Sequence, residues 1–205
     1  MNDRRRGVLV GLPAMALTLA LAPALLAACS GSGDGGSATT TEAAQQVDCS
    51  PARPGTSAEA TFEHDGVERP YRLDVPDGDS GTIAMPLVVS LHGFAAYRVL
   101  QETNTSLGRR GAERGFVVVT PDALGEPLEC NMLGAPDRAD DFAYVGELVD
   151  HLVETLCVDA DRVFAAGHSN GSAFAGFLVC QAPYRFAGVA MVAAPVPSVC
   201  PDDVV

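Results

Sequence analysis

The sequence contains no lysine and no tryptophan, so all 13 of its basic residues are arginines. It also carries 26 aspartates and glutamates, which give a formal net charge of −13. This charge argues against a nucleic-acid partner, because binding of phosphates needs a basic patch. No two cysteines have the close spacing of zinc ligands, and we therefore expect neither a metal site nor a cofactor. Hydrophobic residues make up 47% of the chain, which is enough for a packed core.

The N-terminus has the pattern of an export signal. Three arginines, residues 4–6, precede an apolar stretch that ends in small residues. The next residue completes Leu-Ala-Ala-Cys, which resembles the lipobox of bacterial lipoproteins, in which this cysteine carries lipid. We predict a signal peptide over residues 1–28, a lipidated Cys29 and a flexible Ser/Gly/Thr linker over residues 29–57. The protein is then extracellular and anchored by lipid to the surface of the bacterial membrane. A retained membrane helix is the alternative, and the general and twin-arginine export routes both stay open.

Six cysteines are present, and five remain if Cys29 carries lipid. An exported protein can join its cysteines in disulfides, so two bridges and one leftover thiol are expected. The spacing of the cysteines does not decide which of them pair.

The strand pattern begins near residue 58, and we predict a folded domain over residues 58–205. Two alternating segments, 60–63 and 71–75, with Asp65-Gly66 between them, predict an antiparallel hairpin. Continuous apolar runs then predict parallel strands that are covered on both faces. These runs are residues 87–91, 116–119, 162–166 and 189–192.

Helical patterns separate the later strands. The clearest helix is predicted over residues 141–156, with Asp140 or Asp141 as its N-cap. A second is predicted over residues 171–181, and a third over part of residues 103–114. Two strands followed by a repeated strand–helix order predict an α/β fold whose sheet is mostly parallel and flanked by helices.

The strongest chemical signal is Gly167-His168-Ser169-Asn170-Gly171, which follows a predicted strand and precedes a predicted helix. This is the context that the G-x-S-x-G nucleophile elbow of α/β-hydrolases requires. A serine on such a sharp turn has strained backbone, and side chains on the flanking glycines would clash there. We predict Ser169 as the nucleophile, with Gly167, His168 and Gly171 forming the elbow around it.

A second signal, Leu91-His92-Gly93-Phe94, comes at the end of the predicted strand over residues 87–91. In G-x-S-x-G hydrolases the loop at this place supplies one amide of the oxyanion hole, and the residue after the serine supplies the other. The predicted donors are therefore the backbone N–H groups of Phe94 and Asn170. Two amides aimed at a developing oxyanion lower the barrier on the order of several kcal/mol.

On these motifs the chain resembles the polyhydroxybutyrate-depolymerase-like and feruloyl-esterase-like family of α/β-hydrolases, which also includes acetylxylan esterases. The resemblance covers about residues 58–196. The matching stretches are residues 66–76, 86–93, 115–122, 140–142 and 158–171. The resemblance implies an α/β-hydrolase fold, and it implies hydrolysis of an ester on a polymer or on an aromatic-acid conjugate.

The sequence departs from the family pattern around the catalytic centre. In α/β-hydrolases the acid and then the histidine of the triad follow the serine in the chain. No histidine follows Ser169, and the only acids after it are Asp202 and Asp203. We therefore expect a C-terminally truncated family member that lacks the last strands of the fold and the triad Asp and His. In addition, Ser172 stands where the family usually has a glycine, and a family tryptophan expected near Asn131 is absent.

None of the four histidines suits the role of the missing base. His168 neighbours the serine on a turn that points it away, and His92 belongs to the oxyanion loop. His151 is predicted on the exposed side of its helix, and His64 lies next to the first hairpin. Since an unactivated serine is a poor nucleophile, we expect an inactive or weak esterase. A non-catalytic binding lipoprotein of the cell surface and a gene fragment are the alternatives.

Overall fold

The domain begins with a hairpin that forms one side of a six-stranded sheet. The computed structural model describes residues 55–77, 83–131, 135–183 and 185–194. β1 (Thr56–His64) and β2 (Val67–Val75) pair antiparallel along their whole length. Asp65 and Gly66 join the two strands. Both have positive φ (51° and 74°), which a two-residue turn needs if its twist is to match that of the strands. The predicted hairpin is confirmed, and its strands are longer than predicted.

The other four strands follow the predicted apolar runs. They are β3 (Met85–Leu91), β4 (Val117–Pro121), β5 (Val158–His168) and β6 (Gly188–Val192). The sheet order is β1-β2-β4-β3-β5-β6. β3 pairs parallel with β4 and β5, and β5 pairs parallel with β6, whereas β2 pairs antiparallel with β1 and β4. The mostly parallel sheet is confirmed, and because β4 and β5 lie on opposite sides of β3, the carboxyl ends of β3 and β5 flank a switch point of the topology.

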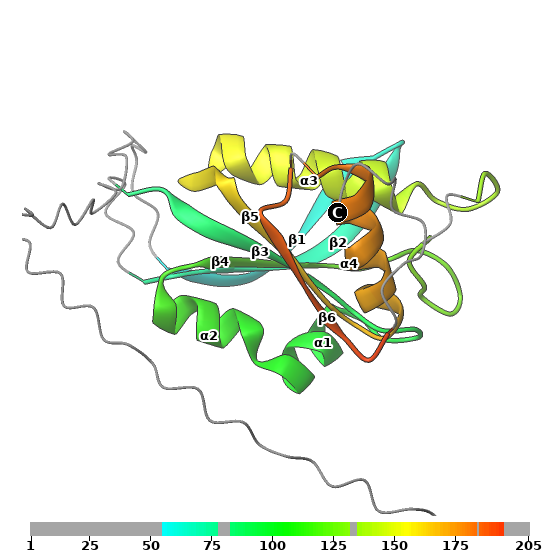
Figure 1. Cartoon of the computed structure of the whole chain (residues 1–205), viewed down its shortest axis with the longest axis horizontal. Coiled ribbons are helices and arrows are strands. Elements are labelled where there is room, and N and C mark those ends of the chain that lie inside the picture. Colours follow the sequence, from blue (N-terminus) through cyan, green and yellow to red (C-terminus); the bar gives the residue numbers. More distant parts are fainter. Residues whose placement is uncertain (1–54, 78–82, 132–134, 184, 195–205) are drawn as a thin grey trace, which may run out of the picture. The chain divides into compact units, whose positions relative to one another are not determined.

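Helices cover both faces of the sheet. They are α1 (Arg98–Thr105), α2 (Leu107–Arg114), α3 (Asp141–Thr155) and α4 (Asn170–Gln181). Figure 1 shows α1 and α2 on one face and α3 and α4 on the other. The sheet is therefore shielded on both sides, which explains why β3 and β4 are continuous apolar runs.

The sequence pattern located α3 better than it located α1 and α2. Asp140 is the N-cap of α3, where its carboxylate accepts a hydrogen bond from the N–H of Ala143, as predicted. The helix predicted over part of residues 103–114 is confirmed as α2, but α1 was not predicted as a separate helix, and the two meet at Ser106. Ser106 has left-handed backbone (φ 52°) and its N–H caps α1 by donating to the carbonyl of Glu102. The helical direction is broken there, so a separate helix, α2, begins at Leu107.

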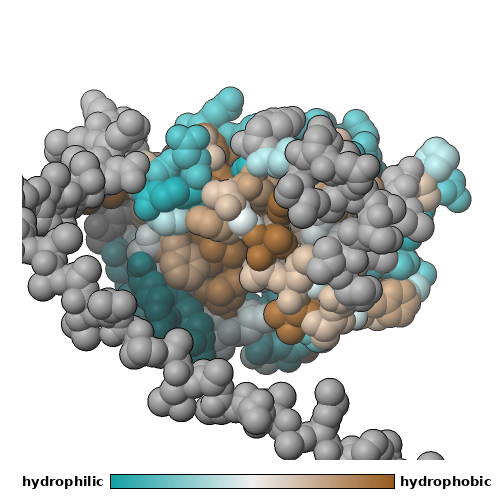
Figure 2. Space-filling view, viewed as in Figure 1, coloured by the Kyte–Doolittle hydropathy of each residue, from teal (hydrophilic) through white to brown (hydrophobic). Residues whose placement is uncertain are grey.

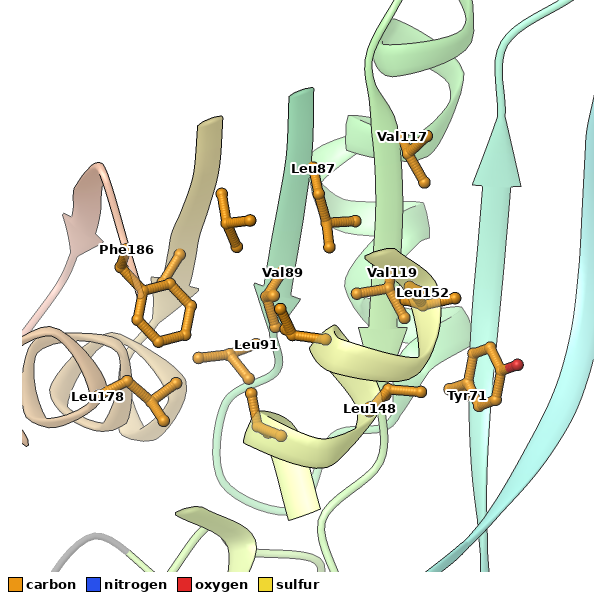
Figure 3. Packing of buried hydrophobic residues seen from close by; sticks show 14 of the residues in the cluster. Tyr71, Leu87, Val89, Leu91, Val117, Val119, Leu148, Leu152, Leu178 and Phe186 are labelled. Atoms are coloured by element: carbon orange, nitrogen blue, oxygen red, sulfur yellow. The ribbon is translucent and has the colours of Figure 1, made fainter. Parts of the chain in front are cut away.

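The core lies between the sheet and the helices on either face. Figure 3 shows Leu148 and Leu152 of α3 turned toward the strand side chains Val89 and Val119, all of them buried in one cluster.

β6 ends the described sheet, and Val192 on it is 56% exposed. In Figure 2 apolar surface gathers where β6 runs in Figure 1. Among the described residues, β6 thus leaves apolar side chains exposed at this edge.

The predicted signal peptide over residues 1–28, the lipidation of Cys29 and nearly all of the predicted linker lie outside the described residues. Within the described ranges, no helix has the length and apolar character to cross a membrane.

Candidate active site

Parallel pairing of β3 and β5 brings the two predicted loops of the site together. Leu91 at the end of β3 is paired with Gly167 near the end of β5. The residues that follow each strand therefore meet at the same edge of the sheet. A Cβ atom built on Gly93 would lie 3.6 Å from the Cβ of Ser169. The glycine of the predicted oxyanion loop is thus packed directly against the predicted nucleophile.

Ser169 has the strained backbone that the sequence predicts for it. Its φ is 54° and its ψ is −117°, a combination that a residue with a side chain rarely adopts. Its N–H donates to the carbonyl of Val192 on β6 (2.9 Å). Its own carbonyl accepts from the N–H groups of Ser172 and Ala173 at the start of α4 (3.0 and 3.1 Å). A tertiary hydrogen bond to β6 on one side and the first hydrogen bonds of α4 on the other therefore hold a conformation that the isolated chain would avoid.

The two glycines of the motif have steric roles. A Cβ on Gly167 would lie 2.1 Å from the carbonyl oxygen of Gly171. A Cβ on Gly171 would lie 2.4 Å from the carbonyl oxygens of both Leu91 and His92. Real Cβ atoms do not approach backbone this closely, so the elbow needs glycine at both positions.

The hydroxyl of Ser169 and the two predicted oxyanion amides are available for a ligand. Ser169 is half-buried, and its Oγ makes no hydrogen bond to any described residue. The N–H groups of Phe94 and Asn170 likewise have no acceptor among the described residues. Asn170 is also the first residue of α4, so the positive end of the helix dipole adds to its amide. The arrangement can place an anionic oxygen beside a serine hydroxyl.

Several proteins named as esterases are similar to this chain in sequence. The protein NocK of Nocardia uniformis subsp. tsuyamanensis, which is named as an esterase, is 32% identical over 139 residues, 65% of this chain and 40% of NocK. Feruloyl esterase B of Piromyces equi is 26% identical over 108 residues, 52% of this chain and 20% of that enzyme. The chain therefore spans less than half the length of the curated relatives it matches. No family model matches the chain.

Solved structures agree on the fold. An acetyl xylan esterase from Aspergillus awamori superposes with a TM-score of 0.58 at 14% identity, over 67% of this chain and 51% of that chain. A ferulic acid esterase superposes with a TM-score of 0.56 at 16% identity, over 66% of this chain and 58% of that one.

The chain therefore has the α/β-hydrolase fold, and it is similar in sequence to proteins named as esterases. The expected fold class and the expected esterase relatives are thus confirmed.

Within this α/β-hydrolase fold, His92 has a structural role. It is 1% exposed, and both of its ring nitrogens are occupied. Nδ1 donates to the carbonyl of Gly93 (2.8 Å), and Nε2 accepts from the N–H of Ala123 (3.0 Å). A ring held in this way has no free nitrogen to take a proton from the serine.

The other three histidines are not placed as a base either. His64 is buried, and its Nδ1 lies 2.9 Å from a carboxylate oxygen of Glu147. His151 is half-buried rather than fully exposed, with its ring 5.3 Å from that of Phe62. His168 is exposed, and no hydrogen bond among the described residues joins its ring to Ser169. Within the described ranges, the hydrolase elbow therefore has no imidazole bonded to its serine.

The cysteines of the domain agree with the expectation of bridges and a leftover thiol. Cys157 and Cys180 each take part in a disulfide bond, and Cys130 is a free, buried thiol. Burial raises the pKa of the Cys130 thiol well above its ordinary value. Burial and the raised pKa therefore predict a thiol that stays protonated and reacts slowly in the folded domain.

Sequence reasoning missed the third segment of the site, residues 122–131. Its Cys130 N–H donates to the side-chain oxygen of Asn170 (3.0 Å), next to the predicted nucleophile. No local motif marks this segment, because its contacts are made with residues far away in the sequence.

Proposed function

We propose that this chain carries the nucleophile and the oxyanion hole of a serine esterase, with Ser169 as the nucleophile. The observation that carries the proposal is the backbone of Ser169, with φ 54° and ψ −117° at the junction of β5 and α4. A conformation of this kind lifts a serine hydroxyl clear of the sheet at a nucleophile elbow. Oγ would attack the ester carbonyl, and the N–H groups of Phe94 and Asn170 would bind the oxygen that becomes negative.

The substrate class of the proposal rests on the resemblance and on the relatives. Relatives are named as a feruloyl esterase and as a bifunctional acetylxylan esterase/xylanase. An ester on a polymer or on an aromatic-acid conjugate is therefore the proposed substrate, as in the polyhydroxybutyrate-depolymerase and feruloyl-esterase type.

In this proposal, none of the 205 residues acts as the base that activates the serine. No histidine follows Ser169 in the sequence, and each earlier histidine is engaged elsewhere or unbonded to the serine. Without a triad, oxyanion binding alone leaves a rate roughly a thousandfold above that of the uncatalysed reaction in water. Loss of a triad costs on the order of a millionfold in kcat, so the chain should hydrolyse a p-nitrophenyl short-chain ester near background.

The test compares the 205-residue chain with the same chain carrying a C-terminal segment grafted from a relative that contains the triad Asp and His. The chain alone should react slowly with a fluorophosphonate probe, and the grafted protein should react fast and turn over the ester. Ser169→Ala should abolish both reactions. Ser172→Ala is the matched control, because Ser172 is fully buried three residues further along α4 and should leave labelling intact.

Two results would contradict the proposal. Labelling that survives Ser169→Ala would place the nucleophile elsewhere. Robust Ser169-dependent turnover by the 205-residue chain alone would show that one of its own histidines acts as the base, and His168 and His151 would be the first two to replace.

Export as a lipid-anchored surface protein is also part of the proposal, on the strength of the apolar N-terminal stretch and the Leu-Ala-Ala-Cys sequence that ends at Cys29. In a bacterial host, Cys29→Ser should move the protein out of the membrane fraction. A variant that stays uncleaved and membrane-bound would favour a transmembrane anchor instead.

A further inference from the structure

The segment of residues 122–131 packs against the predicted oxyanion loop. The N–H of Ala123 donates to Nε2 of His92 (3.0 Å) at one end of the segment. Near its middle, the carbonyl of Leu128 accepts from the N–H of Ala95 (2.8 Å). These two bonds bracket Phe94, whose N–H is one of the two predicted oxyanion donors.

The same segment also contacts the second predicted donor. The N–H of Cys130 donates to the side-chain oxygen of Asn170 (3.0 Å). Asn170 is 9% exposed, so water competes weakly for this bond. Because the bond fixes the side chain of Asn170, it also limits rotation of the peptide that carries the Asn170 N–H. Residues 122–131 therefore touch both halves of the proposed oxyanion hole.

A single buried arginine ties both ends of this segment to the sheet. Nη2 of Arg69 on β2 donates to the carbonyl of Asp122 (3.0 Å) and to Oδ1 of Asp141 at the start of α3 (2.5 Å). Oδ2 of Asp141 accepts from the N–H of Asn131 (2.6 Å). The guanidinium of Arg69 also lies over the ring of Tyr144, 3.8 Å from its centre. Asp122 and Asn131 are thus anchored to the two members of one ion pair, Arg69 and Asp141.

The anchor is stiff because it is buried. Arg69 is 1% exposed and Asp141 is 3% exposed, so the pair is hardly screened by solvent. A buried charge that loses its partner is strongly unfavourable, so neither side chain can swing away to water without a large cost. Rigid support of this kind is what a preorganised site requires.

We propose that Arg69 is a positioning residue for the oxyanion hole, an inference that rests on the proposed function. Its guanidinium holds residues 122–131 in place, and that segment holds the two loops that carry the N–H groups of Phe94 and Asn170. The ion pair with Asp141 therefore acts on the reaction through backbone geometry, without touching substrate.

The experiment uses the full chain and four variants. Arg69→Met removes the charge and keeps an unbranched side chain over Tyr144. Arg69→Met with Asp141→Asn removes both charges together, so it avoids an unpaired buried carboxylate if the single variant fails to fold. Arg69→Lys keeps the charge but lacks the planar fork of donors. Arg109→Met is the matched control, because the pair that Arg109 forms with Glu113 is exposed.

Amide hydrogen exchange is the first readout, since the N–H groups of Ala123 and Cys130 are hydrogen-bonded and buried. We expect their exchange to be at least about tenfold faster in the two variants that carry Arg69→Met. It should be intermediate in Arg69→Lys and unchanged in Arg109→Met. Exchange in α2, which has no bond to Arg69 or Asp141, should stay as in the wild type, which separates a local effect from general destabilisation. Unchanged exchange at Ala123 and Cys130 in the two variants that carry Arg69→Met would overturn the proposal.

The rate of fluorophosphonate labelling at Ser169 is the second readout. Misplacement of the donors should lower the maximal labelling rate on the order of a hundredfold and leave the half-saturating probe concentration unchanged. Equal maximal rates in wild type and variants would also overturn the proposal. A wild type that never labels at Ser169 would refute the proposed function, and amide exchange would then decide by itself whether Arg69 holds the segment.

Discussion

Replacement of Gly171 by alanine tests the geometry of the elbow most directly. The new Cβ would lie 2.4 Å from two backbone oxygens, those of Leu91 and His92, and 2.6 Å from the carbonyl carbon of Leu91. Ordinary contacts between such atoms are about 1 Å longer, and backbone cannot rotate away as a side chain can. The start of α4 must therefore move relative to the end of β3.

The magnitude follows from two opposing effects. Alanine gains about 1 kcal/mol over glycine as a helix former. Overpacking costs about 1–3 kcal/mol and occasionally more, and contacts with three backbone atoms belong at the upper end. We therefore expect Gly171→Ala to lower the free energy of unfolding by about 2 kcal/mol. In a domain of this size the midpoint of thermal unfolding should fall by about 4–8 °C.

Gly146→Ala is the matched control. Gly146 lies inside α3, and a Cβ there would meet nothing within 4 Å. The same substitution should therefore raise the free energy of unfolding by about 0.5–1 kcal/mol. Both variants can be measured by urea unfolding followed by far-ultraviolet circular dichroism, with the midpoint compared at equal slope. If Gly171→Ala is as stabilising as Gly146→Ala, the close packing of the elbow against β3 is refuted.

Three further predictions concern single side chains. Cys130 should resist a thiol reagent such as iodoacetamide in the folded protein and react after unfolding, because burial raises its pKa and shields it. Asp140→Ala should lower the free energy of unfolding by about 1 kcal/mol through loss of the cap on Ala143, whereas Asp140→Asn should keep most of it in the same urea assay. The hydrogen bond from Arg162 lowers the pKa of Asp159, so this carboxylate stabilises the fold above its unfolded pKa, near 4, and less as the pH falls through its folded pKa. The stability difference between wild type and Asp159→Asn, measured by urea unfolding as a function of pH, should therefore vanish in acid, and a constant difference would show that Asp159 acts otherwise.

The sequence predicted those parts of the fold whose signals are local. The alternation of apolar and polar residues, together with Asp65-Gly66, predicted the hairpin. Continuous apolar runs predicted the buried parallel strands. The sequence located α2 but did not predict α1 as a separate helix, because one residue makes the break between them. Ser106 adopts left-handed backbone and divides α1 from α2, although serine carries no strong preference for that conformation. Strand ends were also predicted too short, because polar residues near them still pair in the ladder.

The site was predictable to the extent that it is a motif. Gly167, Ser169 and Gly171 could be found because the elbow needs these residue types at this spacing, and Gly93 because it follows a strand that ends at the same edge. Their proximity depended on the parallel pairing of β3 and β5, which the order of strands and helices implied. Their chemical roles stay predictions until Ser169 is labelled.

The support of the site could not be found in the same way. Arg69 and Asp141 are separated by 72 residues, and each alone would be expected at the surface. Their burial is reasonable only in the three-dimensional fold, where Arg69 faces Asp122 and Asp141 at once. A motif reports the residues whose type the chemistry dictates, whereas the groups that hold them need only reach the right place. Variation of such a supporting pair should therefore change how well the loops are held without changing which chemistry they can perform, and the Arg69 variants separate these two effects.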